Sequence, residues 1–418
     1  MMALQVDALV LGAGAVGTAV ALHLQRRGME VVLVDRRDPG EETSFGNAGL
    51  LERATLVPYA FPRSVWKLAR YARNRRSDMR YDLLHLPRIA LWLVRYWWHS
   101  QQDRLSASAD ALLPLIEDCL RAHEELAEVA EAKALIRKEG WVEPLLSPQA
   151  RDEAQARIDA ARKHSVTGLL LGRERLVALE PCVSTAVETA IHWIDPWTVL
   201  DPGALLKAHA AALVRLGGTF LRGDAATLSQ ENGLWQVEST NGPASAPRAV
   251  VAMGPWSADL TSRLGYRVPL ITKRGYHMHY GLENGSSLRR PILDEEGGYV
   301  LAPMTRGIRL TTGIEFAAPD APPNTIQLDR AELRARHLLP ALGERLDPHP
   351  WLGRRPCLPD MRPIIGPAPR QEGLWFCFGH AHHGLTLGPV SGLLLAQLVT
   401  GEKPFADPTP FAVTRFRS

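Results

Sequence analysis

The 418-residue sequence is poor in cysteine: Cys119, Cys182, Cys357 and Cys377 stand far apart, with no C-x-x-C pair. This argues against a zinc site, an iron–sulfur cluster or a disulfide framework, and it fits a reducing compartment. The formal net charge of +3 is too small to indicate nucleic acid as a partner. No uncharged apolar run reaches the roughly 18 residues that a transmembrane helix needs. No Ser–His–Asp order or cluster of metal ligands is evident, so no metal is expected.

The composition, with 46 % hydrophobic and 22 % charged residues, is typical of a globular protein. The length predicts two or three domains. The apolar start of the chain, Val6 to Val20, has no basic segment before it, contains Asp7 and is dense in glycine. We interpret it as a nucleotide-binding strand and turn and not as a signal peptide, and we expect a cytoplasmic protein.

The turn Gly12-Ala13-Gly14-Ala15-Val16-Gly17 is a complete G-x-G-x-x-G sequence. It follows a short apolar strand and opens a predicted helix, and Asp35 ends the next predicted strand. Gly12 permits the tight turn, Gly14 lets the backbone approach a pyrophosphate, and Gly17 lets helix and strand pack closely. The helix N-terminus offers N–H groups to the phosphates, and Asp35 can accept hydrogen bonds from a ribose diol. The sequence therefore predicts a dinucleotide site, but this motif does not separate FAD from NAD.

Further segments carry a resemblance to a known family. They are ETSFGNAGLL (42–51), DPG (201–203), GGTF (217–220), AMGPWS (252–257), GRRPCLPDMRPIIG (353–366) and GHAHHGLTLG (379–388). In this order they resemble the motifs of the D-amino acid oxidase/glycine oxidase family of FAD-dependent oxidoreductases. The chain is most similar to the small-subunit type of bacterial D-amino acid dehydrogenase.

The resemblance implies an α/β fold, with a Rossmann-like FAD-binding domain and a discontinuous mixed or antiparallel-sheet (α+β) substrate domain. We expect the FAD-binding domain at 1–57, 198–265 and 360–418, and the substrate domain at 58–197 and 266–359. FAD is expected to bind non-covalently, because Cys357 does not match the cysteine that tethers flavin in monomeric sarcosine oxidase. The expected cofactor-binding residues are Gly12, Gly14, Ala15, Val16, Gly17, Asp35, Arg36, Thr43, Ser44, Asn47, Ala48, Gly49, Leu50, Ala225, Gly254, Trp256, Gly384, Leu385 and Thr386.

The resemblance also implies substrate-side residues. Arg355, the arginine before proline in GRRP, matches the family's ligand for the substrate carboxylate, although a shift of one residue would place Arg354 there instead. Tyr276 and Tyr299 lie on predicted strands and either share that carboxylate or are half-buried sheet aromatics. His380 and His382 either contact the substrate or flavin edge or have a capping or packing role.

The family's reaction implies hydride transfer from Cα of a D-amino acid, or of a cyclic D-imino acid such as a proline derivative, to flavin N5. The imine product then hydrolyses to a 2-oxo acid, and no protein base is required. Alternatives are a glycine/sarcosine-type oxidase that uses O2 and a 2-hydroxy-acid flavin dehydrogenase. An FAD-binding subunit inactive without a partner and an NAD-dependent reductase are further alternatives. The electron acceptor, either a quinone or O2, stays open.

Residues Glu52 to Arg104 contain eleven Lys/Arg and four Asp/Glu, a surplus of seven positive charges, interleaved with Trp66, Trp92, Trp97 and Trp98. Leu83 to Trp98 is compatible with an amphipathic helix that contacts the inner face of a membrane. The alternative, which we favour, is a substrate-domain helix with its aromatics in the core and its arginines in solvent. Docking onto a partner subunit through residues 58–100 is a third interpretation.

Overall fold

The glycine turn lies between strand β2 (Ala8–Leu11) and helix α1 (Ala15–Gln25) in the computed structural model, which describes residues 4–416. The next strand, β3 (Val31–Asp35), pairs parallel with β2 and ends on the acidic residue of the motif. Apart from Asp35, the residues of both strands are apolar and buried, because helices cover one face of their sheet and a second layer covers the other. This is the predicted Rossmann-like unit.

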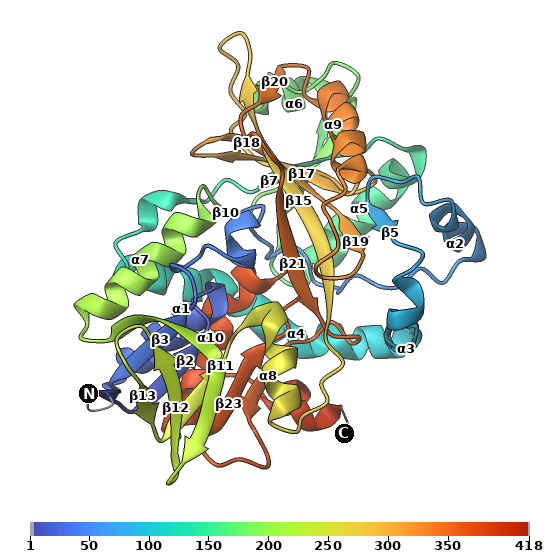
Figure 1. Ribbon diagram of the computed structural model, residues 1–418. Helices are drawn as coiled ribbons and strands as arrows, with labels where there is room; N and C mark the ends of the chain where they lie inside the picture. The colour runs from blue at the N-terminus through green and yellow to red at the C-terminus, as the bar shows by residue number, and fades with distance from the viewer. Residues whose placement is uncertain (1–3, 417–418) are drawn as a thin grey trace.

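The unit belongs to a nine-stranded sheet. In spatial order its strands are β1 (Leu4–Gln5), β13 (Ala244–Ala246), β12 (Leu234–Ser239), β11 (Thr219–Glu231), β3, β2, β14 (Arg248–Val251), β23 (Leu374–Phe378) and β22 (Ile364–Pro367). The strands from β11 to β23 are parallel. Figure 1 shows this sheet at the lower left. Helix α1 packs on one face with α4 (Gln102–Val129), α7 (Pro202–Arg215) and α10 (Gly384–Thr400), whereas α8 (Ser257–Arg263) covers the other face.

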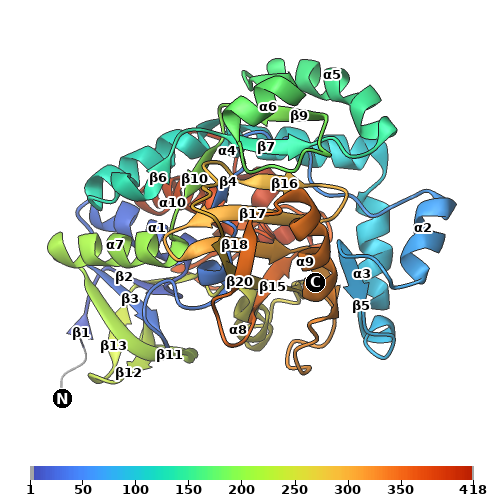
Figure 2. The same cartoon turned by 90° about the horizontal axis from the view of Figure 1, so that it is seen from above.

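An eleven-stranded mixed sheet forms the second part of the molecule. Its strands are β5 (Met79–Tyr81), β19 (Ile314–Phe316), β15 (Ile271–Leu282), β18 (Gly307–Thr312), β17 (Tyr299–Met304), β16 (Ile292–Asp294), β7 (Trp141–Pro144), β9 (Thr189–Trp193) and β8 (Gly168–Gly172), with β20 (Leu342–Arg345) and β21 (Trp351–Cys357) also paired to β15. Helix α9 (Ile326–Leu338) packs on one face. Helices α5 (Pro148–Arg162) and α6 (Arg173–Leu179) lie beside β8 and β9 (Figure 2).

Smaller elements connect the two sheets. A three-stranded sheet comprises β4 (Leu50–Leu51), β10 (Trp197–Val199) and β6 (Ile136–Arg137). Helices α2 (Val65–Ala72) and α3 (Leu86–His99) lie on the right in Figure 1. Single 3-10 turns are η1 (Thr43–Gly46), η2 (Lys133–Leu135), η3 (Gly254–Trp256), η4 (Thr409–Phe411) and η5 (Val413–Arg415). The exact domain boundaries stay a prediction.

The basic, tryptophan-rich segment contains the helix expected within Leu83 to Trp98, with Pro87 in its first turn. One face of α3 packs in the core through Ile89, Trp92 and Tyr96. Trp66, Trp97 and Trp98 are exposed, so only Trp92 of the four tryptophans is buried. Within residues 4–416, no helix combines the length and apolar character that crossing a bilayer requires.

Candidate active site

Backbone crowding explains the glycines of the first turn. Gly12 has φ +104°, and a Cβ there would lie 2.6 Å from the carbonyl oxygen of Ala252. A Cβ on Gly17 would lie 1.7 Å from the carbonyl oxygen of Gly12, so helix α1 can approach the turn only with glycine at that position. Gly14 has more room: its nearest neighbour would be the Ser44 hydroxyl at 3.2 Å. The turn therefore leaves bare backbone beside the start of α1, as a pyrophosphate requires.

Two polar side chains reach the N–H groups of this turn. A carboxylate oxygen of Asp35 accepts from the Ala13 N–H at 2.6 Å, and the Ser44 hydroxyl accepts from the Ala15 N–H at 3.0 Å. Burial raises the pKa of Asp35, and hydrogen bonds from the Ala13 and Arg37 backbone partly oppose this. Asp35 and Ser44 therefore lie where a ribose and a pyrophosphate would meet the protein.

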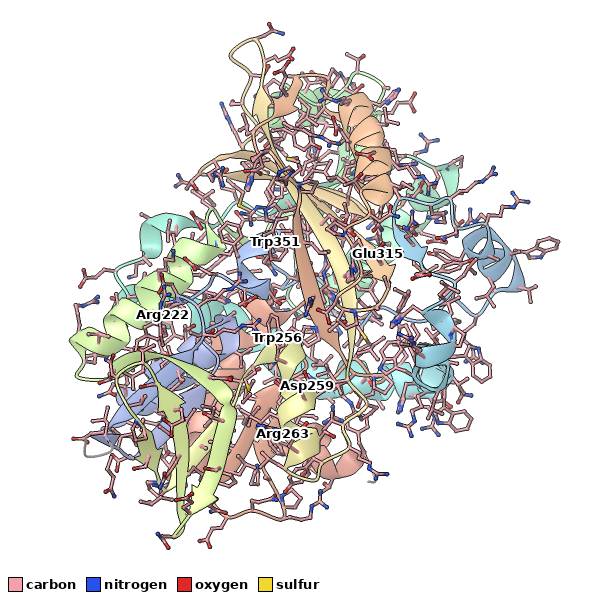
Figure 3. The ribbon with its side chains drawn as sticks, in the orientation of Figure 1. Arg222, Trp256, Asp259, Arg263, Glu315 and Trp351 are labelled. Atoms are coloured by element: carbon pink, nitrogen blue, oxygen red, sulfur yellow. The ribbon has the colours of Figure 1, made fainter. Side chains whose placement is uncertain are left out.

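Arg36, directly after β3, and Trp256 line the predicted dinucleotide site together. The Arg36 guanidinium lies 4.3 Å from the centre of the Trp256 ring and pairs with Glu42 at 2.7 Å. Figure 3 shows Trp256 below Trp351 and above Asp259 and Arg263. Glu42 precedes η1, so this contact joins the end of β3 to the second predicted flavin loop.

The second loop, residues 42–51, is anchored from the other sheet by a residue that the sequence analysis did not identify. Arg309 of β18 is buried and donates to the carbonyl oxygens of Phe45 at 2.8 Å and Asn47 at 2.7 Å. Its Nε donates to His279 Nε2 at 3.0 Å, and His279 Nδ1 lies 2.6 Å from Asp347. Burial lowers the pKa of Arg309 to about 10. Only the pairing of loop and strand in the folded chain reveals this role.

The third predicted loop, 379–388, leads into α10. Burial lowers the pKa of His380 to about 3, and its Nε2 lies 3.0 Å from the Ser391 hydroxyl. His382 Nε2 lies 3.9 Å from the Glu52 carboxylate, and burial, His383, Arg355 and Lys273 hold its pKa well below its usual range. Both imidazoles are therefore neutral near pH 7. His380 has the packing contact given as the alternative and also lines the cavity described below, whereas His382 lies among charged groups of that cavity.

A single cavity of about 1670 Å³ connects these elements. Sixteen of the nineteen predicted cofactor-binding residues line it: Gly12, Gly14, Ala15, Val16, Asp35, Arg36, Thr43, Ser44, Asn47, Ala48, Leu50, Ala225, Gly254, Trp256, Gly384 and Leu385. The other three, Gly17, Gly49 and Thr386, lie outside its wall. Gly17 packs against Gly12, Gly49 lies against the Val199 carbonyl oxygen, and the Thr386 hydroxyl donates to the Leu50 carbonyl at 3.2 Å. These three support the wall and do not form it.

The structure separates the two adjacent arginines. Arg355 lines the cavity, and its guanidinium lies over Gly275, where a Cβ would be 2.5 Å from Nη1. It donates to the carbonyl oxygens of Gly313 at 2.7 Å and Thr312 at 3.0 Å. Arg354 lies on the other side of β21, outside the wall of this cavity, and pairs with Asp320 at 2.7 Å. Alternation along the strand thus places only Arg355 at the cavity.

Neither predicted tyrosine presents a free hydroxyl beside Arg355. Tyr276 is on the face of β15 that packs on α9, and its hydroxyl donates to Glu315 and accepts from Arg274 and the Asn324 N–H. Tyr299 is buried in the same cluster, and burial and Asp294 raise its pKa. Both residues touch the edge of the cavity, but their surroundings are those of buried sheet aromatics. The expectation that either shares a carboxylate with Arg355 is therefore not supported by their placement.

The cavity fits FAD. Its lining runs from Asp35 and the glycine turn, past the start of α10, to Arg355, and residues of both sheets contribute to it. A parallel dinucleotide-binding sheet, a second mixed sheet and one cavity lined by both define a flavin-dependent oxidoreductase of the two-domain type.

The family model "FAD dependent oxidoreductase" (DAO) matches residues 7–398, and the chain belongs to this family. It is 31 % identical to a D-amino-acid oxidase of Bradyrhizobium diazoefficiens, over 97 % of this chain and 98 % of that protein. It is 29 % identical to D-amino acid dehydrogenase 2 of Mesorhizobium japonicum, over 96 % and 97 %. Among solved structures, glycine oxidase from Geobacillus kaustophilus has the same fold, with a TM-score of 0.76 and 21 % identity over 99 % of this chain and 100 % of that one. The protein is thus an FAD-dependent enzyme, as predicted.

Proposed function

We propose that the enzyme oxidises a D-amino acid, or a cyclic D-imino acid such as a proline derivative, at Cα to an imine that hydrolyses to the 2-oxo acid. The observation that carries this proposal is the placement of Arg355 at the cavity. Its guanidinium donates to two backbone carbonyl oxygens and has no carboxylate partner among residues 4–416. Its remaining N–H groups suit a substrate carboxylate. The relatives named D-amino-acid oxidase and D-amino acid dehydrogenase support the substrate class.

Bound FAD supplies the acceptor for the hydride that leaves Cα. The chain itself supplies orientation and a controlled charge environment. Arg355 fixes the carboxylate and so orients Cα within the cavity. The neutral His382 adds no positive charge beside the substrate amine, which must lose its proton before hydride can leave. Non-covalent attachment of FAD stays part of this proposal.

The deciding experiment is an anaerobic screen in which D- and L-amino acids, glycine, sarcosine and 2-hydroxy acids are tested for bleaching of the flavin. We expect D-amino acids to bleach it fastest. Bleaching by glycine and sarcosine alone, or by 2-hydroxy acids alone, would replace the proposal by one of those alternatives. Peroxide release in air would identify O2 as the acceptor, and its absence would favour a quinone.

Arg355→Gln tests the carboxylate role directly. The loss of a charged two-point contact predicts a fall of kcat/KM of about 100-fold or more. Arg354→Gln is the matched control, because Arg354 pairs with Asp320 away from the cavity, and its kcat/KM should stay within about threefold of wild type. Equal losses in the two variants would contradict the assignment.

We also infer that the outer face of α3 contacts an anionic lipid surface. Leu91, Val94 and Trp98 follow one another at helical spacing and are exposed, directly opposite the buried Ile89, Trp92 and Tyr96. Arg88 and Arg95 of the same helix are exposed and supply attraction to anionic headgroups, about 1 kcal/mol for each cation near the surface. Exposed apolar and aromatic side chains beside basic ones are typical of in-plane membrane contacts.

Co-sedimentation with vesicles tests this contact. The protein should bind vesicles containing phosphatidylglycerol, bind vesicles of phosphatidylcholine weakly, and dissociate as salt is raised. Leu91→Glu should abolish binding, whereas Leu333→Glu, at an exposed leucine of α9, should not. Equal binding of both variants would rule out α3 as the contact.

A further inference from the structure

Lys273 is a buried cation that the proposed reaction does not yet use. It lies on β15 directly opposite Arg355 of β21, lines the same cavity and is 3 % exposed. Within residues 4–416, its ammonium makes no hydrogen bond or ion pair. Its neighbours are aromatic: the ring centres of Tyr96, Trp92 and Phe316 lie 4.3, 5.0 and 5.6 Å from Nζ.

An unpaired buried ammonium is costly, and the aromatic rings offset only part of this cost. Burial lowers the pKa of Lys273, and the nearby Arg355 lowers it further. Burial likewise lowers the pKa of Arg355. Two buried cations on the wall of one cavity, neither of them in an ion pair among the described residues, form a site that an anionic ligand would stabilise.

The positions of the two cations indicate what they bind. Lys273 and Gly275 share one face of β15, and the Arg355 guanidinium lies over Gly275. Two residues along a strand span roughly 7 Å, so the Arg355 guanidinium lies one side-chain position along β15 from Lys273 on the same face. The Glu52 carboxylate also faces this end of the cavity, beside His382. With neutral histidines, two cations and one carboxylate leave a surplus of one positive charge.

Two other carboxylates of the cavity, those of Glu143 and Glu295, pair with Arg157. Glu143 accepts both N–H groups of Arg157 and the indole N–H of Trp193. Glu295 lies 3.1 Å from Arg157. The two carboxylates share this one guanidinium, and burial raises the pKa of Glu295. The surplus of one positive charge is therefore local to Lys273, Arg355 and Glu52. An amino acid with an ammonium, an α-carboxylate and a second acidic group carries the net charge of −1 that would balance it.

We propose that Lys273 is a specificity-determining residue that binds a second anionic group of the substrate, so that acidic D-amino acids such as D-aspartate or D-glutamate are preferred over their amides. This inference rests on the proposed function, which assigns the α-carboxylate to Arg355. The side-chain carboxylate then meets the ammonium at the edge of the aromatic wall formed by Trp92, Tyr96 and Phe316.

The experiment compares ligands that differ in charge but hardly in shape. Anaerobic flavin reduction is measured with D-aspartate against D-asparagine and with D-glutamate against D-glutamine, for wild type, Lys273→Met and Lys273→Arg. Wild type should prefer the acids by about tenfold or more in kcat/KM. Lys273→Met should bring the ratio near one while changing the value for D-asparagine by less than about threefold, and Lys273→Arg should retain a preference. Lys207→Met, at an exposed lysine paired with Glu41, is the control.

A binding measurement separates this inference from the oxidation itself. Calorimetric titration of the holoenzyme with succinate and with its monoamide, succinamate, should show about tenfold tighter binding of succinate, lost in Lys273→Met. Equal affinities of wild type for succinate and succinamate would overturn the assignment. An equal loss of affinity for both ligands in Lys273→Met would also overturn it. If no amino acid reduces the flavin, the proposed function fails while the succinate ratio still tests Lys273. If neutral D-amino acids are oxidised but acidic ones are not preferred, only the Lys273 inference fails.

Discussion

Arg309 connects the substrate sheet to the loop that begins the flavin site, and its replacement tests how that loop is held. Arg309→Met keeps most of the side-chain length but removes the guanidinium. The carbonyl oxygens of Phe45 and Asn47 and the Nε2 of His279 then lose their donors. Each buried acceptor left without a donor costs about 1–3 kcal/mol, so the three together predict a loss of roughly 3–9 kcal/mol.

The loss divides between folding and cofactor binding. If the loop at 43–49 becomes ordered only when FAD binds, the free energy of ordering it lowers the affinity for FAD. A share of about 3 kcal/mol corresponds to a rise in Kd of about 100-fold. The remainder lowers the stability of the apoprotein. The assay pairs a titration of apoprotein with FAD, followed by flavin fluorescence, with urea unfolding of the apoprotein.

Arg306→Met is the matched control, since Arg306 is half exposed and its ion pair among the described residues is with Asp347, at 2.8 Å. An exposed ion pair contributes about 0–1 kcal/mol, so this variant should bind FAD like wild type. Unchanged FAD affinity together with unchanged apoprotein stability in Arg309→Met would refute the reasoning. It would mean that the loop is held by contacts other than Arg309.

Three further predictions follow from the packing. Gly17→Ala should yield protein without bound flavin, since its Cβ would lie 1.7 Å from the Gly12 carbonyl oxygen. Gly172→Ala, at a site with no atom within 4 Å and no positive φ, should retain flavin, and the absorbance ratio of the purified proteins checks both. His209→Leu should reduce acid sensitivity: burial lowers the pKa of His209 to about 3, so below the unfolded value near 6.5 only the unfolded chain gains this proton and stability falls as pH falls. Between pH 7 and pH 5 this one group costs about 2 kcal/mol, so the difference in stability between urea unfolding at pH 7 and at pH 5 should be smaller by about that amount in the variant. Acid precipitation should release all FAD into the supernatant; flavin retained in the pellet would contradict non-covalent binding.

The dinucleotide turn could be predicted from sequence because its constraints are local. Gly12, Gly17 and Asp35 lie within one strand–helix–strand unit, and each is required by a contact inside that unit or next to it. The closing loop at 379–388 was also recognisable, because a short glycine-rich entry into a long apolar helix is a contiguous pattern. The resemblance in the second loop, 42–51, completed the assignment to FAD.

Tertiary structure alone decided which side chains meet. Arg354 and Arg355 differ by one residue, so the register of β21 against β15 determines which of them faces the cavity. The same alternation turns the Tyr276 hydroxyl toward Glu315 and leaves Lys273 at the cavity. Arg309 lies more than 260 positions from the loop it holds. Helix α3 has two apolar faces, and only packing shows that Trp92 is buried while Trp98 is exposed. Motifs made of contiguous residues can be recognised from sequence. The sheet face that a side chain occupies and the residues that it contacts depend on the pairing of strands distant in sequence.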